Sequence, residues 1–161
     1  MSVGTVIHDT FTIARTFPVP PEKVFDAFSS ADAKNVWGDT GNLESADVEE
    51  YAPEFDFRVG GRERFVVKMD GTVFRYDALY YDIVPNRRIV YTYEMYANDQ
   101  RISVSVTTIH FVECDEGTAF TYTEQGAFLD GIDGVEAPRL REEGTAEMID
   151  NLSVFVTSPS D

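Results

Sequence analysis

The chain has 161 residues, 43% of them hydrophobic and 13% aromatic, which is the size and composition of one folded domain spanning residues 1–161. Its formal net charge of -16 at pH 7 repels phosphate backbones and anionic lipids, which argues against nucleic-acid partners and membrane insertion. Cys114 is the sole cysteine, so no intrachain disulfide can form, and without a signal-peptide pattern or an apolar run of about 20 residues a cytoplasmic location is expected.

The N-terminal elements follow from periodicity and proline placement. Polar and apolar residues alternate from Thr5 to Phe17, which predicts a first strand. Pro21 and Glu22 suit the first turn of a helix, because proline lacks only a donor that is unused there and the carboxylate complements the positive helix end. A second short helix is predicted from Ala33 to Trp37, and it should end at Gly38.

From Leu43 onwards, turn signals replace the helical period. They separate six predicted strands, near residues 43–51, 62–69, 72–84, 87–97, 101–114 and 118–128. Asp70-Gly71 is the sharpest hairpin signal, because both central positions of a type I′ turn need positive φ. Short links predict an antiparallel meander, and strands longer than the usual length of about six residues predict a strongly twisted sheet.

The last part of the chain changes from a loop pattern to a helical one. Residues from Phe128 to Arg139 include two glycines and a proline, which predicts a loop. From Leu140 onwards apolar residues recur every three to five positions with charged residues between them, which predicts a long amphipathic helix. Gly144 inside this helix costs about 1 kcal/mol relative to alanine, and either a close approach to the sheet or a plain weak spot would explain it.

This order of elements and several motifs resemble a known superfamily. The motifs are FPVPPEKVFDAF at 17–28, WG at 37–38, FRVGGR at 57–62, IVPNRRIVYT at 83–92 and GTAFTYTEQG at 117–126. The chain is similar to START-like (SRPBCC) proteins, and most similar to their branch named after activators of the heat-shock-protein-90 ATPase. The resemblance implies a helix-grip α+β fold, in which a curved antiparallel sheet of about seven strands wraps a long C-terminal helix, with two short helices after the first strand.

In the fold that the chain resembles, the concave sheet face and the last helix enclose a cavity. Strand alternation groups Arg75 with Asp77, Tyr91 with Tyr93, and Tyr122 with Glu124, and we take these as the concave sides. Trp37 would lie at the helical mouth. The predicted ligand-binding residues are Trp37, Arg75, Asp77, Tyr91, Tyr93, Tyr122, Glu124 and Met148. Arg75 would pair with Asp77 or Glu124. The alternative is that the tyrosines are ordinary core residues and the charges form a structural pair at a wet rim.

Signals for other chemistry are weak in this sequence. His110 and Cys114 share a strand face but lie about 13 Å apart at 3.3 Å per residue, too far to bind one zinc ion, so no metal is predicted. No nucleophile elbow, phosphate-binding loop or dinucleotide fingerprint occurs in the sequence, so no cofactor is predicted. Cys114 is flanked by acidic residues, which would repel a thiolate, so this thiol is predicted to be inert.

Three functions remain open at this point. The favoured hypothesis is a binding domain for a small apolar molecule. The second is a cyclase-like or dehydratase-like enzyme that uses Glu124 or Asp77 as its acid or base, which is less favoured because neither residue belongs to a recognisable catalytic constellation. The third is an interaction protein that regulates a chaperone or another partner through an acidic outer face. Exposed strand edges would also allow a homodimer.

Overall fold

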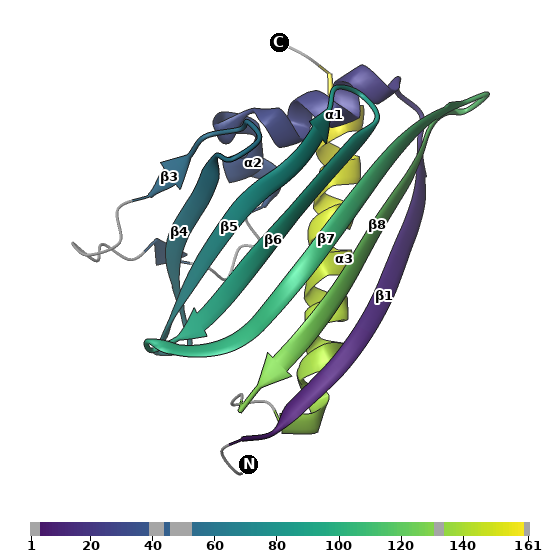
Figure 1. Ribbon diagram of the computed structural model, residues 1–161. Coiled ribbons are helices and arrows are strands. Elements are labelled where there is room, and N and C mark those ends of the chain that lie inside the picture. Colours follow the sequence, from purple (N-terminus) through teal and green to yellow (C-terminus); the bar gives the residue numbers. More distant parts are fainter. Residues whose placement is uncertain (1–3, 39–43, 46–52, 131–133, 160–161) are drawn as a thin grey trace.

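The computed structural model describes residues 4–38, 44–45, 53–130 and 134–159 (Figure 1). In chain order its elements are β1 (Val6–Phe17), α1 (Pro21–Ser29), α2 (Ala31–Trp37), β2 (Glu44–Ser45), β3 (Glu54–Phe55), β4 (Arg62–Met69), β5 (Thr72–Val84), β6 (Arg88–Ala97), β7 (Gln100–Cys114), β8 (Gly117–Leu129), a 3₁₀ turn η1 (Gly134–Glu136) and α3 (Ala137–Thr157).

The strands form one antiparallel sheet in the order β1-β8-β7-β6-β5-β4-β2, with β3 also pairing with β4. β4 to β8 are a continuous meander, and β1 returns to pair with β8 along its whole length. Figure 1 shows the long strands curving together, with α3 running along one face of the sheet and α1 and α2 lying across one end. The predicted helix-grip α+β fold is therefore confirmed.

The hairpin turns explain why the meander forms where it does. Asp70 and Gly71 have φ of 51° and 81°, as the predicted type I′ turn between β4 and β5 requires. Asn98 and Asp99 have φ of 48° and 68° between β6 and β7, and asparagine and aspartate tolerate this left-handed region better than other side chains do. Both turns hold neighbouring strands in antiparallel register.

The helix boundaries differ from the prediction in two places. α2 begins at Ala31 rather than Ala33, because the Ser30 side chain caps it by accepting a hydrogen bond from the Ala33 amide at 3.2 Å. The loop predicted over residues 128–139 is too long at both ends. β8 continues to Leu129, and α3 begins at Ala137 with a proline in its first turn, where proline is tolerated.

The edge of the sheet beyond β4 is the part that the sequence predicted least well. Of the strand predicted near 43–51, the structure describes β2 at Glu44–Ser45, and residue 43 and residues 46–51 lie outside the described residues. β3 at Glu54–Phe55 was not predicted, because two residues are too short to show a period.

The core lies between the concave sheet face and α3. On the helix, Ile149, Leu152 and Val156 are at most 1% exposed, and they join a cluster that includes Phe17 and Phe120 from the sheet. Residues three and four apart share a helix face, so these side chains form the buried stripe of α3. The helix packs on β1 and β8 and against α1 and α2.

Gly144 makes no close approach to the sheet. A Cβ built at this residue meets no other atom within 4 Å, and the residue is exposed in the middle of α3. We therefore expect Gly144→Ala to raise the free energy of unfolding by about 0.5–1 kcal/mol, because alanine lowers the entropy of the unfolded chain and creates no clash. Urea unfolding followed by the fluorescence of Trp37 measures this gain.

Gly117→Ala is the contrasting variant. Gly117 has a φ of 135°, and a Cβ there would lie 2.4 Å from the carbonyl oxygen of Phe17. This variant should lose stability in the same assay. If Gly144→Ala lost stability as well, the open environment assigned to this position of α3 would be wrong.

Candidate functional site

A buried polar cluster lies on the inner face of the sheet under α3. Glu124 on β8 is 1% exposed, and the Tyr93 hydroxyl donates a 2.8 Å hydrogen bond to its Oε1. Arg141 of α3 reaches down to the same place, where its Nη1 donates to the Tyr93 oxygen at 2.7 Å and lies 3.5 Å from Glu124 Oε2. Ser103 and Ser105 of β7 complete what we call the Glu124 cluster: Tyr93, Ser103, Ser105, Glu124 and Arg141.

The sheet makes room for this cluster by placing small residues beneath it. Tyr93, Ser105 and Gly126 are in register across β6, β7 and β8, so they point to the same face. Ser103 accepts a 2.9 Å hydrogen bond from Arg141 Nη2, and Ser105 donates to Glu124 Oε2 at 3.4 Å. A Cβ at Gly126 would lie 3.1 Å from Ser105 Oγ, so a larger residue at this position would push against Ser105 and the Glu124 cluster.

Burial sets the protonation behaviour of the cluster. Burial raises the pKa of Glu124, while Arg141 and the hydrogen bonds from Tyr93 and Ser105 oppose the rise without cancelling it. Burial also raises the pKa of Tyr93 well above its usual range, against the pull of Arg141. The Tyr93 hydroxyl therefore remains a donor at neutral pH. One cation and one carboxylate face each other in this cluster, so the two formal charges compensate.

A second buried polar group lies nearer α2. Glu63 on β4 is 7% exposed, and its Oε1 accepts hydrogen bonds from Tyr80 at 2.7 Å and from Lys34 Nζ at 2.6 Å. This group ties α2 to the sheet edge. Between the two groups, the hydroxyls of Tyr91 and Tyr122 lie 3.1 Å apart. Tyrosine hydroxyls thus lie along the inner face of the sheet between the Glu63 group and the Glu124 cluster.

An aromatic surface leads from the edge of the sheet to the Glu124 cluster. Phe65 on β4 is 38% exposed and stacks on Tyr76 at 4.7 Å between ring centroids, and Tyr76 stacks on Tyr93 at 4.9 Å. On α3, helical spacing places Gly144 on the same flank as Arg141 and away from β1, with open space at its Cβ position. Aromatic rings therefore connect the exposed Phe65 at the sheet edge with the buried Glu124 cluster.

A pocket of about 240 Å³ that is open to solvent lies away from the Glu124 cluster. It is lined by Pro18–Pro21 and by residues 113–117 at the β7–β8 turn. None of the predicted ligand-binding residues lines it. Within the described ranges, no three His, Cys, Asp or Glu side chains are grouped so that they could hold a metal ion. None of the helices described here is both long and apolar enough to cross a membrane.

Six of the predicted residues lie on the inner side of the fold. Tyr91, Tyr93, Tyr122 and Glu124 share the concave face and are joined in pairs by hydrogen bonds. Met148 lies partly buried on α3, one turn beyond Gly144. Trp37 is 2% exposed, and its indole donates to the Ala27 carbonyl at 2.9 Å, so it lies within the helical layer rather than at an open mouth.

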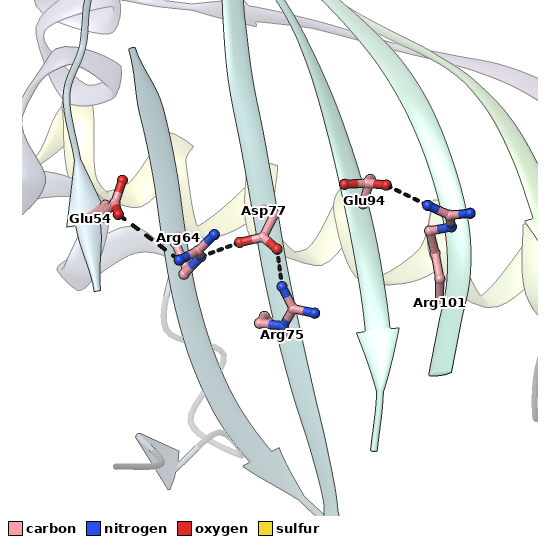
Figure 2. A network of polar contacts seen from close by, with 6 residues as sticks. All are labelled: Glu54, Arg64, Arg75, Asp77, Glu94 and Arg101. Carbon is pink, nitrogen blue, oxygen red and sulfur yellow. Dashed lines mark hydrogen bonds and ion pairs between the residues drawn. The ribbon is translucent and has the colours of Figure 1, made fainter. Parts of the chain in front are cut away.

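Arg75 and Asp77 lie on the opposite face, so the predicted inner side of β5 is wrong. Figure 2 shows Asp77 between Arg64 and Arg75 on the outer face, with α3 passing behind the strands. The reason is a bulge in the pairing of β5 with β6 between Tyr80 and Asp82. Because of this bulge both Tyr80 and Ile83 face inward, although they are three residues apart. Strict alternation counted back from Ile83 therefore assigns Arg75 and Asp77 to the inner face, whereas they lie on the outer face.

Arg141, Ser103, Ser105, Lys34 and Glu63 were not predicted as site residues. The sequence did contain a signal for the two serines. On β7 they occupy alternating positions that face the core, where a half-buried strand usually carries apolar residues. Arg141 gave no such signal, since charged residues flank the apolar stripe of every amphipathic helix.

The architecture defines the class of protein: a long helix held across the concave face of a curved antiparallel sheet is the helix-grip arrangement. Residues 18–157 match the family model described as "Activator of Hsp90 ATPase homolog 1-like protein". The chain therefore belongs to this family, as the sequence motifs indicated.

Solved structures agree with this assignment. An uncharacterised protein from Rhizobium leguminosarum is 42% identical over 94% of this chain and 96% of its own, with a TM-score of 0.82. Mll3558 from Rhizobium loti is also 42% identical, over 94% of this chain and 99% of its own, with a TM-score of 0.80. CV1439 from Chromobacterium violaceum, at 24% identity and a TM-score of 0.76 over 93% of this chain and 98% of its own, shows the shared fold. A search of curated proteins found no match.

Proposed function

We propose that this domain binds a small, neutral, largely apolar molecule between α3 and the inner face of β4 to β6. The observation that carries the proposal is the Glu124 cluster, in which Arg141 compensates the charge of Glu124. The cluster lies among apolar side chains of α3 and the sheet, and at Gly144, on the same side of α3 as Arg141, a side chain would meet no other atom within 4 Å. Binding sites for small molecules are mostly apolar with a few convergent polar groups, and this combination matches that pattern. The apolar part of the ligand would lie along Phe65 and Tyr76.

The charge of the cluster indicates which polar group the ligand carries. Arg141 and Glu124 already balance each other, so a ligand carboxylate would add an uncompensated charge to a buried site. A hydroxyl or carbonyl oxygen can instead accept a hydrogen bond from Arg141 without changing the net charge, and a hydroxyl can also donate to Glu124. The proposed ligand class is therefore long-chain or ring-shaped alcohols and ketones rather than fatty acids.

The test compares decan-1-ol with decanoate, which have the same chain length but a different head group. We expect decan-1-ol to displace the neutral dye Nile red from the protein, and decanoate to bind at least about tenfold more weakly, a difference of about 1.4 kcal/mol. Native mass spectrometry should show one decanol per chain. Equal binding of both compounds would contradict the proposed neutral ligand, and no binding of either compound or of the dye would contradict the site.

Matched variants locate the site. Arg141→Met should abolish the preference for decanol, whereas Arg139→Met should leave it unchanged, because the Arg139 side chain is 58% exposed and pairs with Glu136 and Glu143 on the surface. Gly144→Phe should block entry while leaving the Glu124 cluster intact, which covers the case in which Arg141→Met folds poorly. Binding that is unchanged in Gly144→Phe would place the ligand elsewhere.

An acid-base role for Glu124 is the second candidate, supported by the burial that raises its pKa. Asp77 has no part in it, since this residue lies on the outer face between two arginines. Glu124→Gln separates the two functions, because glutamine keeps an oxygen that can accept from Tyr93 but cannot take up a proton. Binding of decanol with no chemical change in either protein supports the binding role alone.

A further inference from the structure

The outward face of the sheet is uncharged over most of three neighbouring strands, and the exception on β7 is Arg101 near its start, which pairs with Glu94 of β6 (Figure 2). Pairing register identifies the side chains of β1, β8 and β7 that point away from α3, because their neighbours along each strand are buried against the helix layer. They are mainly threonine, valine and alanine: Val6, His8, Thr10, Thr12, Ala14, Thr16, Val104, Val106, Thr108, His110, Val112, Ala119, Thr121, Thr123, Gln125, Ala127 and Leu129. We call this surface the neutral face.

The neutral face is open to solvent. Val104, Val106 and Val112 are 39%, 38% and 56% exposed, and in Figure 1 none of the described helices lies over this side of β7, β8 and β1. Thr12 and Thr123 share a 3.0 Å hydrogen bond between their hydroxyls, so part of the polar capacity of the face is already used. β-branched side chains are stiff and lose little rotamer freedom when they become buried. Such a surface is well suited to being covered.

Charge makes this face exceptional in the chain. The protein carries 29 acidic residues and a net charge of -16. None of the acidic residues that the structure describes lies on the neutral face. The predicted acidic outer face thus does not extend to these strands. At the border on β6, Glu94 pairs with Arg101 at 3.0 Å and Arg88 pairs with Asp82, so the margin is locally balanced as well (Figure 2 shows the first pair).

We propose that the neutral face packs against the same face of a second copy of this chain in a symmetric homodimer. Two copies with a net charge of -16 repel each other, and contact through a face without acidic side chains keeps the described repelling groups outside the interface. A basic partner would gain no charge pairing on this face. A surface of alternating threonine and valine can pack on itself, as two sheets do in a β-sandwich.

The size of the face limits the strength of the dimer. Three strands about 4.8 Å apart and about ten residues long, at about 3.3 Å per residue, present roughly 500 Å² per copy. The dimer would therefore bury about 1,000 Å² in total, which is at the lower end of specific interfaces and typical of weak association. This proposal does not depend on the ligand site, because the neutral face lies on the other side of the sheet.

Salt gives the dimer a distinctive signature. The two copies repel each other through their net charge, and salt screens this repulsion, so dimerisation should become stronger as sodium chloride increases. Association with a basic partner, or through complementary charges, would become weaker instead. Sedimentation velocity over a range of protein concentrations, at low and high salt, measures this dependence. A protein that stays monomeric throughout, or a dimer that weakens in high salt, overturns the proposal.

A matched pair of lysine variants tests the surface itself. Val106→Lys places a charge near the centre of the neutral face and should weaken dimerisation by at least about tenfold, because burying an unpaired charge is costly. Val154→Lys on α3 makes the same change of net charge at a residue that is 68% exposed, and it should leave the dimer intact. Thr123→Lys repeats the test on β8, and the fluorescence of Trp37 verifies folding. A dimer that is equally strong in all three variants is not formed by this face.

Discussion

Replacing Arg141 with methionine is expected to lower the free energy of unfolding by about 3–5 kcal/mol at neutral pH, because the variant leaves Glu124 buried without its cation. Methionine fills most of the space of the arginine stem, so the loss arises mainly from charge. The Arg139→Met variant on the same helix should lose far less stability than Arg141→Met, since its surface ion pairs are exposed to water and screened by it.

The loss in Arg141→Met should grow with pH. Burial already raises the pKa of Glu124 in the folded protein above its ordinary value of 4.5, so the contribution of this residue to stability is complete below that value and is lost as pH rises through the folded pKa. Removing Arg141 takes away an opposing interaction, so the pKa rises further and more stability is lost. The variant should therefore be close to wild type in acid and well below it at neutral pH.

Urea unfolding at several pH values, followed by Trp37 fluorescence, measures this difference. The double variant Arg141→Met with Glu124→Gln should recover much of the loss, because no buried charge then remains without a partner. A loss that is the same at acidic and neutral pH, and is not recovered in the double variant, would mean that Arg141 acts through packing alone.

The sequence predicted the fold well because the fold depends on local signals. Turn residues with positive φ mark the ends of β4 and β6, alternation marks β1, and a proline marks the start of α1. Each of these signals acts within a few residues and agrees with the others, so the order of elements emerged without knowledge of long-range contacts.

The site was predicted only in part, because it depends on contacts between distant segments. The bulge in β5 leaves no clear trace in the sequence, since apolar residues such as Leu79 and Tyr80 occupy both sides of the strand around it. The meeting of Arg141 with Glu124 depends on how α3 is rotated over the sheet. Alternation was sufficient on β6 and β8, where the stretches that carry Tyr91, Tyr93, Tyr122 and Glu124 pair without a register shift.

Replacing Leu152 with alanine should show whether α3 is seated on the sheet as described. Leu152 is fully buried in the core cluster together with Ile149 and Val156. Leucine-to-alanine changes at such positions remove apolar contacts and leave a cavity, so we expect a loss of about 2–5 kcal/mol. Val154→Ala, two residues further along the same helix, changes a side chain that is 68% exposed and should alter stability by no more than about 0.5 kcal/mol.

The contrast between these two positions bears on the ligand site as well as on the core. Arg141 reaches Glu124 because the buried stripe of α3 sets the rotation of the helix over β1 and β8. If Leu152→Ala and Val154→Ala lost the same small amount of stability, the helix would not have this rotation in solution. Arg141 would then have no fixed position above Glu124, and neither the charge compensation nor the preference for a neutral ligand would follow.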